Sequence, residues 1–152
     1  VKKRLLRPMI GWREWVDFPD FNIERVNAKI DTGAKSSALH AYRIRPINID
    51  SEPFVEFFVH PVQRHKKPEI FCVAPLVDRR VIQSSNGREE ERFVVETRIR
   101  LGDHIWPIDL TLTNRDEMGF RLLVGRDALR KKFIIDPGAS YLDGRKPEKD
   151  IS

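Results

Sequence analysis

The stretch AKIDTGAKSSALHA, residues 28–41, decides how the chain is interpreted. Apolar residues alternate up to Ile30 as on a half-buried strand, so Asp31 at its end is expected to point away from the core. Gly33 allows a sharp turn and leaves the carboxylate uncovered, and Thr32 supplies a hydroxyl group. A carboxylate held on a rigid strand before open space suits acid-base chemistry. An ordinary Asp-x-Gly turn is the alternative interpretation.

The composition predicts one compact domain. The chain has 152 residues, of which 40% are hydrophobic and 34% charged. We expect a single domain over residues 1–152, with loose polar ends at 1–7 and 144–152. No run reaches the roughly eighteen apolar residues that span a bilayer, so no membrane partner is expected. The lone Cys72 excludes an internal disulfide and favours the cytoplasm, or the periplasm if an N-terminal signal has been removed.

The charge balance favours acidic partners. The net charge is +5 and the sequence pI is about 9.6, which attracts anions over a long range. Basic residues are nevertheless scattered among acidic ones, and no aromatic and basic RNA-binding signature is present. We therefore expect no nucleic-acid partner.

Short alternating runs predict an all-β fold. Residues 93–101 and 104–112 alternate around Gly102-Asp103, as in a hairpin, and Ser84 to Gly87 supplies a second turn. Ten prolines and eight glycines punctuate the runs, which is typical of a barrel or sandwich. The one persuasive helix is GRDALRKKF, residues 125–133, with Asp127 as a candidate N-cap.

Two motifs in order carry a resemblance to a known family. Asp-Thr-Gly-Ala at 31–34 is followed, far downstream, by Leu-Leu-Val-Gly-Arg at 122–126, with a hairpin between them. From about residue 23 to 133 the chain resembles the retropepsin-like aspartic proteases. More narrowly, it resembles the bacterial proteins labelled ATP-dependent zinc proteases, sometimes found alongside ATP-grasp glutamate ligases. The resemblance implies a closed β-barrel of the acid protease fold with one short C-terminal helix.

The resemblance also implies roles for particular residues. Asp31 would be catalytic, and because only one Asp-Thr-Gly is present, a homodimer would supply the second aspartate. Lys35 stands where those proteases commonly carry an acidic residue, so it would either pair with Asp127 in an inverted ion pair or contact substrate carboxylates. The other implied residues are Thr32, Gly33 and Ala34 in the active-site turn, Ser84, Ser85, Asn86 and Gly87 in a substrate-binding flap, and Gly125, Arg126 and Asp127 in structural support.

Metal and cofactor chemistry has little support in the sequence. There is no H-E-x-x-H helix for zinc and no phosphate-binding G-x-x-x-x-G-K-[ST] loop, so neither a metal nor a cofactor is expected. Cys72 has no Cys-His signature around it to mark a nucleophile. Asp136-Pro137-Gly138 mimics the active-site motif but lacks its hydroxyl, and we interpret it as the turn of a terminal strand.

The sequence is compatible with three functions. The first is a homodimeric aspartic peptidase that hydrolyses an acidic or glutamate-rich peptide. The second is a catalytically inactive module of the same fold that binds an extended peptide. The third is a metal-dependent hydrolase.

Overall fold

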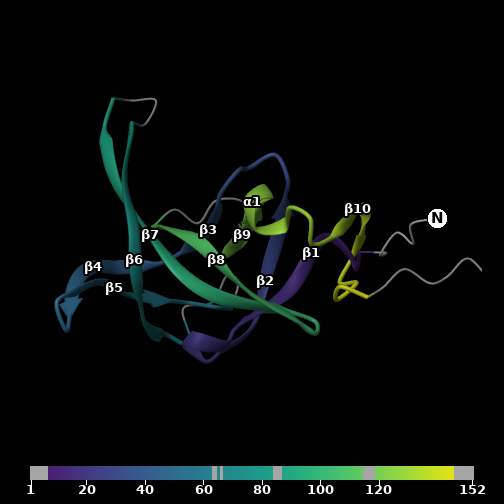
Figure 1. Ribbon diagram of the computed structural model, residues 1–152, viewed down its shortest axis with the longest axis horizontal. Helices are drawn as coiled ribbons and strands as arrows, with labels where there is room; N and C mark the ends of the chain where they lie inside the picture. Colours follow the sequence, from purple (N-terminus) through teal and green to yellow (C-terminus); the bar gives the residue numbers. More distant parts are fainter. Residues whose placement is uncertain (1–6, 63–64, 66, 84–86, 115–118, 146–152) are drawn as a thin grey trace, which may run out of the picture.

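The computed structural model describes residues 7–62, 65, 67–83, 87–114 and 119–145. Strands make up most of this part of the chain, with one short α-helix and one 3-10 turn (Figure 1). The elements are β1 (Met9–Phe18), η1 (Pro19–Phe21), β2 (Ile23–Asp31), β3 (Ser37–His40), β4 (Tyr42–Ile49), β5 (Glu52–Val59), β6 (Ile70–Gln83), β7 (Glu89–Leu101), β8 (His104–Thr113), β9 (Leu122–Gly125), α1 (Arg126–Leu129) and β10 (Ile134–Ser140). The single domain expected over 1–152 stays a prediction, as do its loose ends.

Six strands form a closed barrel. They follow one another in the order β1, β2, β9, β3, β8 and β7, and β7 returns to β1 at the pair Asp17 and Arg100. The side chains of this pair strengthen the closure, because the Arg100 guanidinium donates to Asp17 Oδ2 from Nε at 2.9 Å and from Nη2 at 2.7 Å. The predicted all-β closed barrel is therefore confirmed.

The remaining strands extend the barrel at both ends of the sheet. β10 adds to β1, while β6, β5 and β4 continue outward from β7. β6 and β7 also run beyond the barrel as a long two-stranded arm (upper left in Figure 1). The arm pairs as far as Gln83 and Glu89, so the predicted second hairpin is present up to its tip.

The alternation read from the sequence matches the buried face of the barrel. Val26 and Ala28 are fully buried and Ile30 is nearly so, which leaves Asp31 on the opposite side of β2. The hairpin predicted at Gly102 also forms, with Leu101 opposite His104. Gly102 has φ +61°, and a Cβ there would lie 2.0 Å from the Asp143 carbonyl oxygen, so only glycine fits this turn.

The helix predicted over 125–133 is shorter than expected. It covers only Arg126–Leu129, and its N-cap is Gly125 with no side-chain bond, so the expectation that Asp127 caps it is wrong. The chain leaves the helix at Arg130 and then starts β10, where Ile134 N donates to the Pro8 carbonyl at 3.0 Å. Strand pairing against the β1 side therefore overrides the local helical pattern of 130–133.

The second Asp-x-Gly sequence lies within β10. β10 runs parallel to β1, with a register shift between Gly11 and Arg13 of β1. Gly138 N donates to Asp136 Oδ1 at 3.0 Å, which satisfies the carboxylate locally.

No helix in the described part of the chain is long and apolar enough to cross a bilayer.

A buried carboxylate joins β1 to the segment after β10. Glu14 is fully buried, and it accepts three backbone hydrogen bonds of 2.8 Å. Oε2 accepts from Gly11 and Leu142, and Oε1 accepts from Asp143. Backbone N–H groups thus take the place of water around this charge, which makes its burial tolerable.

We predict that Glu14→Ala lowers the free energy of unfolding by about 3 kcal/mol, because three N–H groups lose their acceptor in a buried site. Urea unfolding followed by tryptophan fluorescence measures the loss. Glu24→Ala is the control, since Glu24 is exposed on β2 and its loss should stay within about 0.5 kcal/mol. Equal losses in the two variants would contradict the anchoring role of Glu14.

Candidate active site

Asp31 ends β2 next to the end of β9. The two strands run parallel, and Asp31 is aligned with Gly125. The carboxylate is half-buried, and its Oδ1 accepts the Gly33 N–H at 3.0 Å. The Ala34 N–H bonds back to the Asp31 carbonyl at 3.3 Å, which closes the turn. The acid is therefore presented at the mouth of a tight turn on a rigid strand.

The start of α1 holds this turn through main-chain bonds. The N–H of Arg126 donates to the Ala34 carbonyl at 2.7 Å, and the N–H of Asp127 donates to the Lys35 carbonyl at 3.0 Å. The Arg126 side chain adds a third bond, from Nη1 to the Thr32 carbonyl at 3.1 Å. First-turn N–H groups of a helix lack partners within it, so the turn satisfies them while being fixed in place.

Gly125 allows the close approach that these bonds require. A Cβ at this position would lie 2.4 Å from the Ser36 carbonyl oxygen and 2.9 Å from that of Ala34. The Gly125 N–H donates to Ser37 Oγ at 3.0 Å in a buried site. Because Gly125 has no side chain and its N–H is bonded to the Ser37 hydroxyl, β9 packs closely against the turn.

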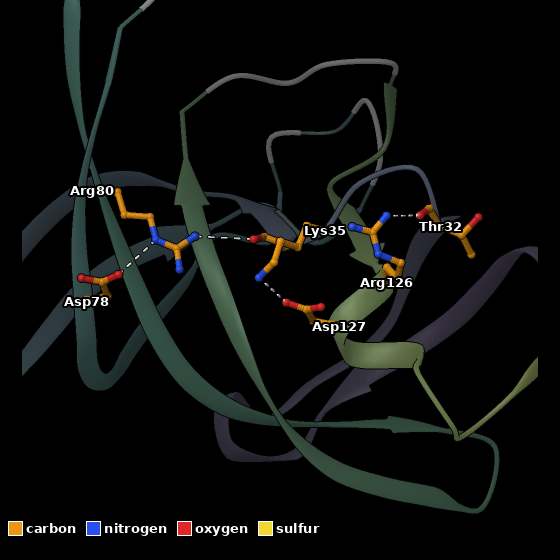
Figure 2. Close-up of polar contacts among 7 residues, drawn as sticks. Thr32, Lys35, Asp78, Arg80, Arg126 and Asp127 are labelled. Atoms are coloured by element: carbon orange, nitrogen blue, oxygen red, sulfur yellow. Dashed lines mark hydrogen bonds and ion pairs between the residues drawn. The ribbon is translucent and has the colours of Figure 1, made fainter.

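An ion pair spans the outside of the turn (Figure 2). Lys35 Nζ lies 3.0 Å from Asp127 Oδ2, so the inverted pair considered from the sequence is present. The hydrogen bond and charge of Lys35 hold the pKa of the Asp127 carboxyl below its usual value. Because Lys35 already has a carboxylate partner, a substrate carboxylate would have to compete with Asp127 for it.

A second cation connects the turn to the arm. Arg80, on β6, lies within 3.5 Å of Ser36 Oγ through Nη1, and its Nε donates to Asp78 Oδ2 at 3.0 Å (Figure 2). A pocket of about 350 Å³ opens beside these residues, between β7, β8 and α1. Its walls include Ser36, Arg80, Trp106, Asp127 and Lys132, whereas Asp31 lies outside it.

The structure brings together most of the residues singled out from the sequence. Residues 31–35 of the turn and 125–127 of the supporting segment are in direct contact. Of the four flap residues, Ser84, Ser85 and Asn86 lie outside the described residues. Gly87 is exposed at the end of the arm, with φ +82°. The roles assigned to all these residues stay predictions.

The described residues give little support for a metal site or for a catalytic cysteine. Over the described residues, no three His, Cys, Asp or Glu side chains are grouped so that they could hold a metal ion. Cys72 is buried, and burial raises the pKa of its thiol to about 12. Such a thiol stays protonated near neutral pH, which is the opposite of an activated nucleophile.

Sequence reasoning missed several residues around the site. Ser37, which accepts from Gly125, and Arg80, which reaches the turn from β6, were not singled out. Both contacts join segments that are far apart in the sequence, so no local pattern could have indicated them.

Comparison with known proteins identifies a matching family. The family model described as RimB-like, retropepsin-like aspartic endopeptidase RimB, matches residues 9–146. A crystal structure of a Legionella pneumophila protein of unknown function is also similar, with a TM-score of 0.73 and 31% sequence identity. The match covers 88% of this chain and 96% of that one, so the fold is shared over nearly the whole length.

Curated relatives are longer proteins. A Shewanella pealeana protein named "Probable alpha-L-glutamate ligase" is 43% identical over 143 residues, which are 94% of this chain and 31% of that protein. A Desulfotalea psychrophila protein of the same name is 42% identical over 151 residues, which are 99% of this chain and 32% of that protein. The chain thus spans about a third of the length of the curated relatives it matches.

We predict that Gly125→Ala lowers the free energy of unfolding by about 2 kcal/mol, since the added methyl group must displace the Ser36 and Ala34 carbonyls. Amide NMR signals of 32–37 should shift at the same time. Gly138→Ala is the matched control, because a Cβ there meets nothing nearer than 3.5 Å. Unchanged turn signals in Gly125→Ala would contradict the tight fit.

We predict that Lys35→Met raises the pKa of Asp127 toward the ordinary aspartate value, because the hydrogen bond and charge that lower it are removed. A carboxyl-carbon NMR titration measures this. In the unmodified chain the pair stabilises the fold above the usual aspartate pKa, and this contribution is lost as the pH falls through the lowered value. Asp20, whose pKa is lowered by Arg98, should titrate alike in both proteins.

Proposed function

The chain belongs to the RimB-like family of retropepsin-like aspartic endopeptidases, and from this premise we propose that it is a homodimeric aspartic peptidase. Its substrate would be an acidic or glutamate-rich peptide. The observation that carries the proposal is the presentation of Asp31, half-buried at a strand end, in a turn that α1 holds through main-chain bonds. Acid-base chemistry at a peptide bond requires a carboxylate that is held in a fixed position in this way.

The dimer follows from the chemistry of the carboxylate. Aspartic proteases work with two carboxyl groups that share one proton, and this sequence contains a single Asp-Thr-Gly motif. A second copy related by a two-fold axis would bring its own Asp31 to the first. The Thr32 hydroxyl would then lie at the contact between the two turns, where it can donate or accept a hydrogen bond.

Hydrolysis would proceed through a water held between the two carboxyl groups. The ionised carboxylate takes a proton from this water while the water oxygen attacks the peptide carbonyl carbon. The protonated partner hydrogen-bonds the carbonyl oxygen and stabilises the negative charge that develops there. Collapse of the tetrahedral intermediate breaks the C–N bond, and the carboxyl group that took the proton from the water passes it to the leaving amine. The titration of the site would belong to the pair of groups.

The arm and the pocket beside the turn would serve the substrate. The β6–β7 arm projects from the barrel and is connected to the turn through Arg80 and Ser36, which suits a flap that closes over an extended peptide. The pocket of about 350 Å³ is large enough for a side chain of that peptide.

The relatives support the choice of a glutamate-rich substrate. Proteins named alpha-L-glutamate ligases contain a segment similar to nearly all of this chain. A peptidase that acts beside glutamate ligation would meet glutamate-rich chains. The net charge of +5 would favour such a substrate at long range.

We predict that Asp31→Asn abolishes peptide hydrolysis, with a loss of at least about a thousandfold, while the dimer persists. Cleavage of a glutamate-rich peptide library, together with analytical ultracentrifugation of both proteins, measures the two properties. Asp136→Asn is the control, because this Asp-x-Gly lies in β10 and bonds Gly138. Equal hydrolysis by Asp31→Asn and the unmodified protein would overturn the proposal. Peptide binding without hydrolysis by either protein would favour the inactive binding module.

A further inference from the structure

The pocket beside the turn is lined by two carboxylates that lie directly opposite each other. Glu96 of β7 and Asp109 of β8 are aligned in the antiparallel pair, and both line the pocket of about 350 Å³. Opposite residues on neighbouring strands have Cβ atoms about 5 Å apart, so these like charges repel. Among the described residues, neither carboxylate has a cation at ion-pair distance. The wall therefore carries two negative charges that no ion pair in this part of the chain offsets.

Two cations at the mouth of the pocket are already paired with other carboxylates. Arg80 Nε donates to Asp78 Oδ2 at 3.0 Å, and Lys35 Nζ lies 3.0 Å from Asp127 Oδ2 (Figure 2). Each of these pairs is neutral as a whole. They leave the charge of the two facing carboxylates unchanged.

Two further cations nearby are also engaged elsewhere. Arg98, two residues after Glu96 on β7, donates from Nη2 to Asp20 Oδ1 at 2.6 Å. Lys132 lines the pocket, and its ammonium group lies 5.9 Å from the centroid of the Trp106 ring, which is a cation–π distance. One lysine cannot neutralise two carboxylates, so the pocket keeps a net negative charge.

A buried hydroxyl group belongs to the same pocket. Thr111 lies two residues after Asp109 on β8, so the two side chains project on the same face of the sheet. Thr111 is only 7% exposed and lines the pocket, and across the described ranges its hydroxyl group has no hydrogen-bond partner. A hydroxyl oxygen accepts N–H groups. The pocket thus offers a third acceptor beside the two carboxylates.

The rest of the wall is largely apolar and can hold the methylene groups of a long side chain. Buried side chains that line it are Val94, Trp106, Ile108 and Ala128. Lysine and arginine combine an apolar stem with a cationic end, which matches apolar surface next to acceptor groups. A glutamate side chain in the same place would meet two like charges.

We propose that this pocket is a subsite for a lysine or arginine side chain of the substrate, whose cation is bound by Glu96, Asp109 and Thr111. The inference rests on the proposed peptidase function and adds one substrate residue to it. Asp127 binds the turn after Asp31 through its N–H and also lines the pocket, so the basic residue would lie within a few positions of the scissile bond. In an otherwise glutamate-rich peptide, a single basic residue would then fix which bond meets Asp31.

Binding to the Asp31→Asn protein tests the subsite without turnover. The probes are fluorescein-labelled heptapeptides of glutamate whose central residue is glutamate, norleucine or lysine, followed by fluorescence anisotropy. Long-range attraction to a protein of net charge +5 would rank the all-glutamate peptide first. The subsite predicts the reverse order, with the lysine peptide binding at least about fivefold more tightly than the norleucine peptide.

The variant Glu96→Gln/Asp109→Asn should remove the preference for lysine. Its matched control is Glu24→Gln/Glu52→Gln, which removes two exposed carboxylates outside the pocket and should keep the preference. Thermal unfolding monitored by circular dichroism checks that both proteins are folded. Lys132→Met is an independent variant, because it removes a positive charge from the wall and should strengthen binding of the lysine peptide about twofold or more. Weaker or unchanged binding in Lys132→Met would contradict the inference.

The outcomes separate this inference from the peptidase proposal. If the all-glutamate peptide binds as tightly as the lysine peptide, or if the pocket variant and its control lose the preference equally, the subsite is overturned. If the preference depends on Glu96 and Asp109 but no hydrolysis depends on Asp31, the peptidase proposal fails and the pocket stands as a binding site. If hydrolysis depends on Asp31 but kcat/KM is equal for the lysine and norleucine peptides, the peptidase stands and the subsite is wrong.

Discussion

The arrangement of the site depends on main-chain contact between the turn after β2 and the first turn of α1. Two N–H groups of α1 bind two carbonyls of the turn, and Gly125 lets the segments approach because it has no side chain. The Ser37 hydroxyl and the Arg126 guanidinium add bonds on either side. Since the helix is too short to be stable alone, this docking supports the helix and the turn together.

Local patterns were sufficient to predict the strands but not their distant partners. Alternation located the strand before Asp31 and both hairpins, because the side-chain period of two is written directly in the sequence. The role of Glu14 could not be read this way, since two of its three donors lie 128 and 129 positions away. The predicted length of α1 was wrong for a related reason. Pairing with the β1 side, and not helix propensity, determines the path of residues 130–134.

The candidate site likewise has parts that the sequence predicted and parts that it did not. Asp31 and its turn, and the Gly-Arg segment, were predicted from motifs whose order in the chain matches a known family, and the structure brings these segments into contact. The bonds that join Ser37 to Gly125 and Arg80 to Ser36 were missed, because no local pattern connects segments that are far apart in the sequence.

β6 belongs to two parts of the molecule at once. Its first half pairs with β5 in the outer extension, and its second half pairs with β7 in the projecting arm. The register shift between Leu76 and Asp78 lies where one half passes into the other, and such an irregularity bends a strand and increases its twist. The arm is therefore continuous in chain with the outer sheet, and the irregular step of β6 lies between the two.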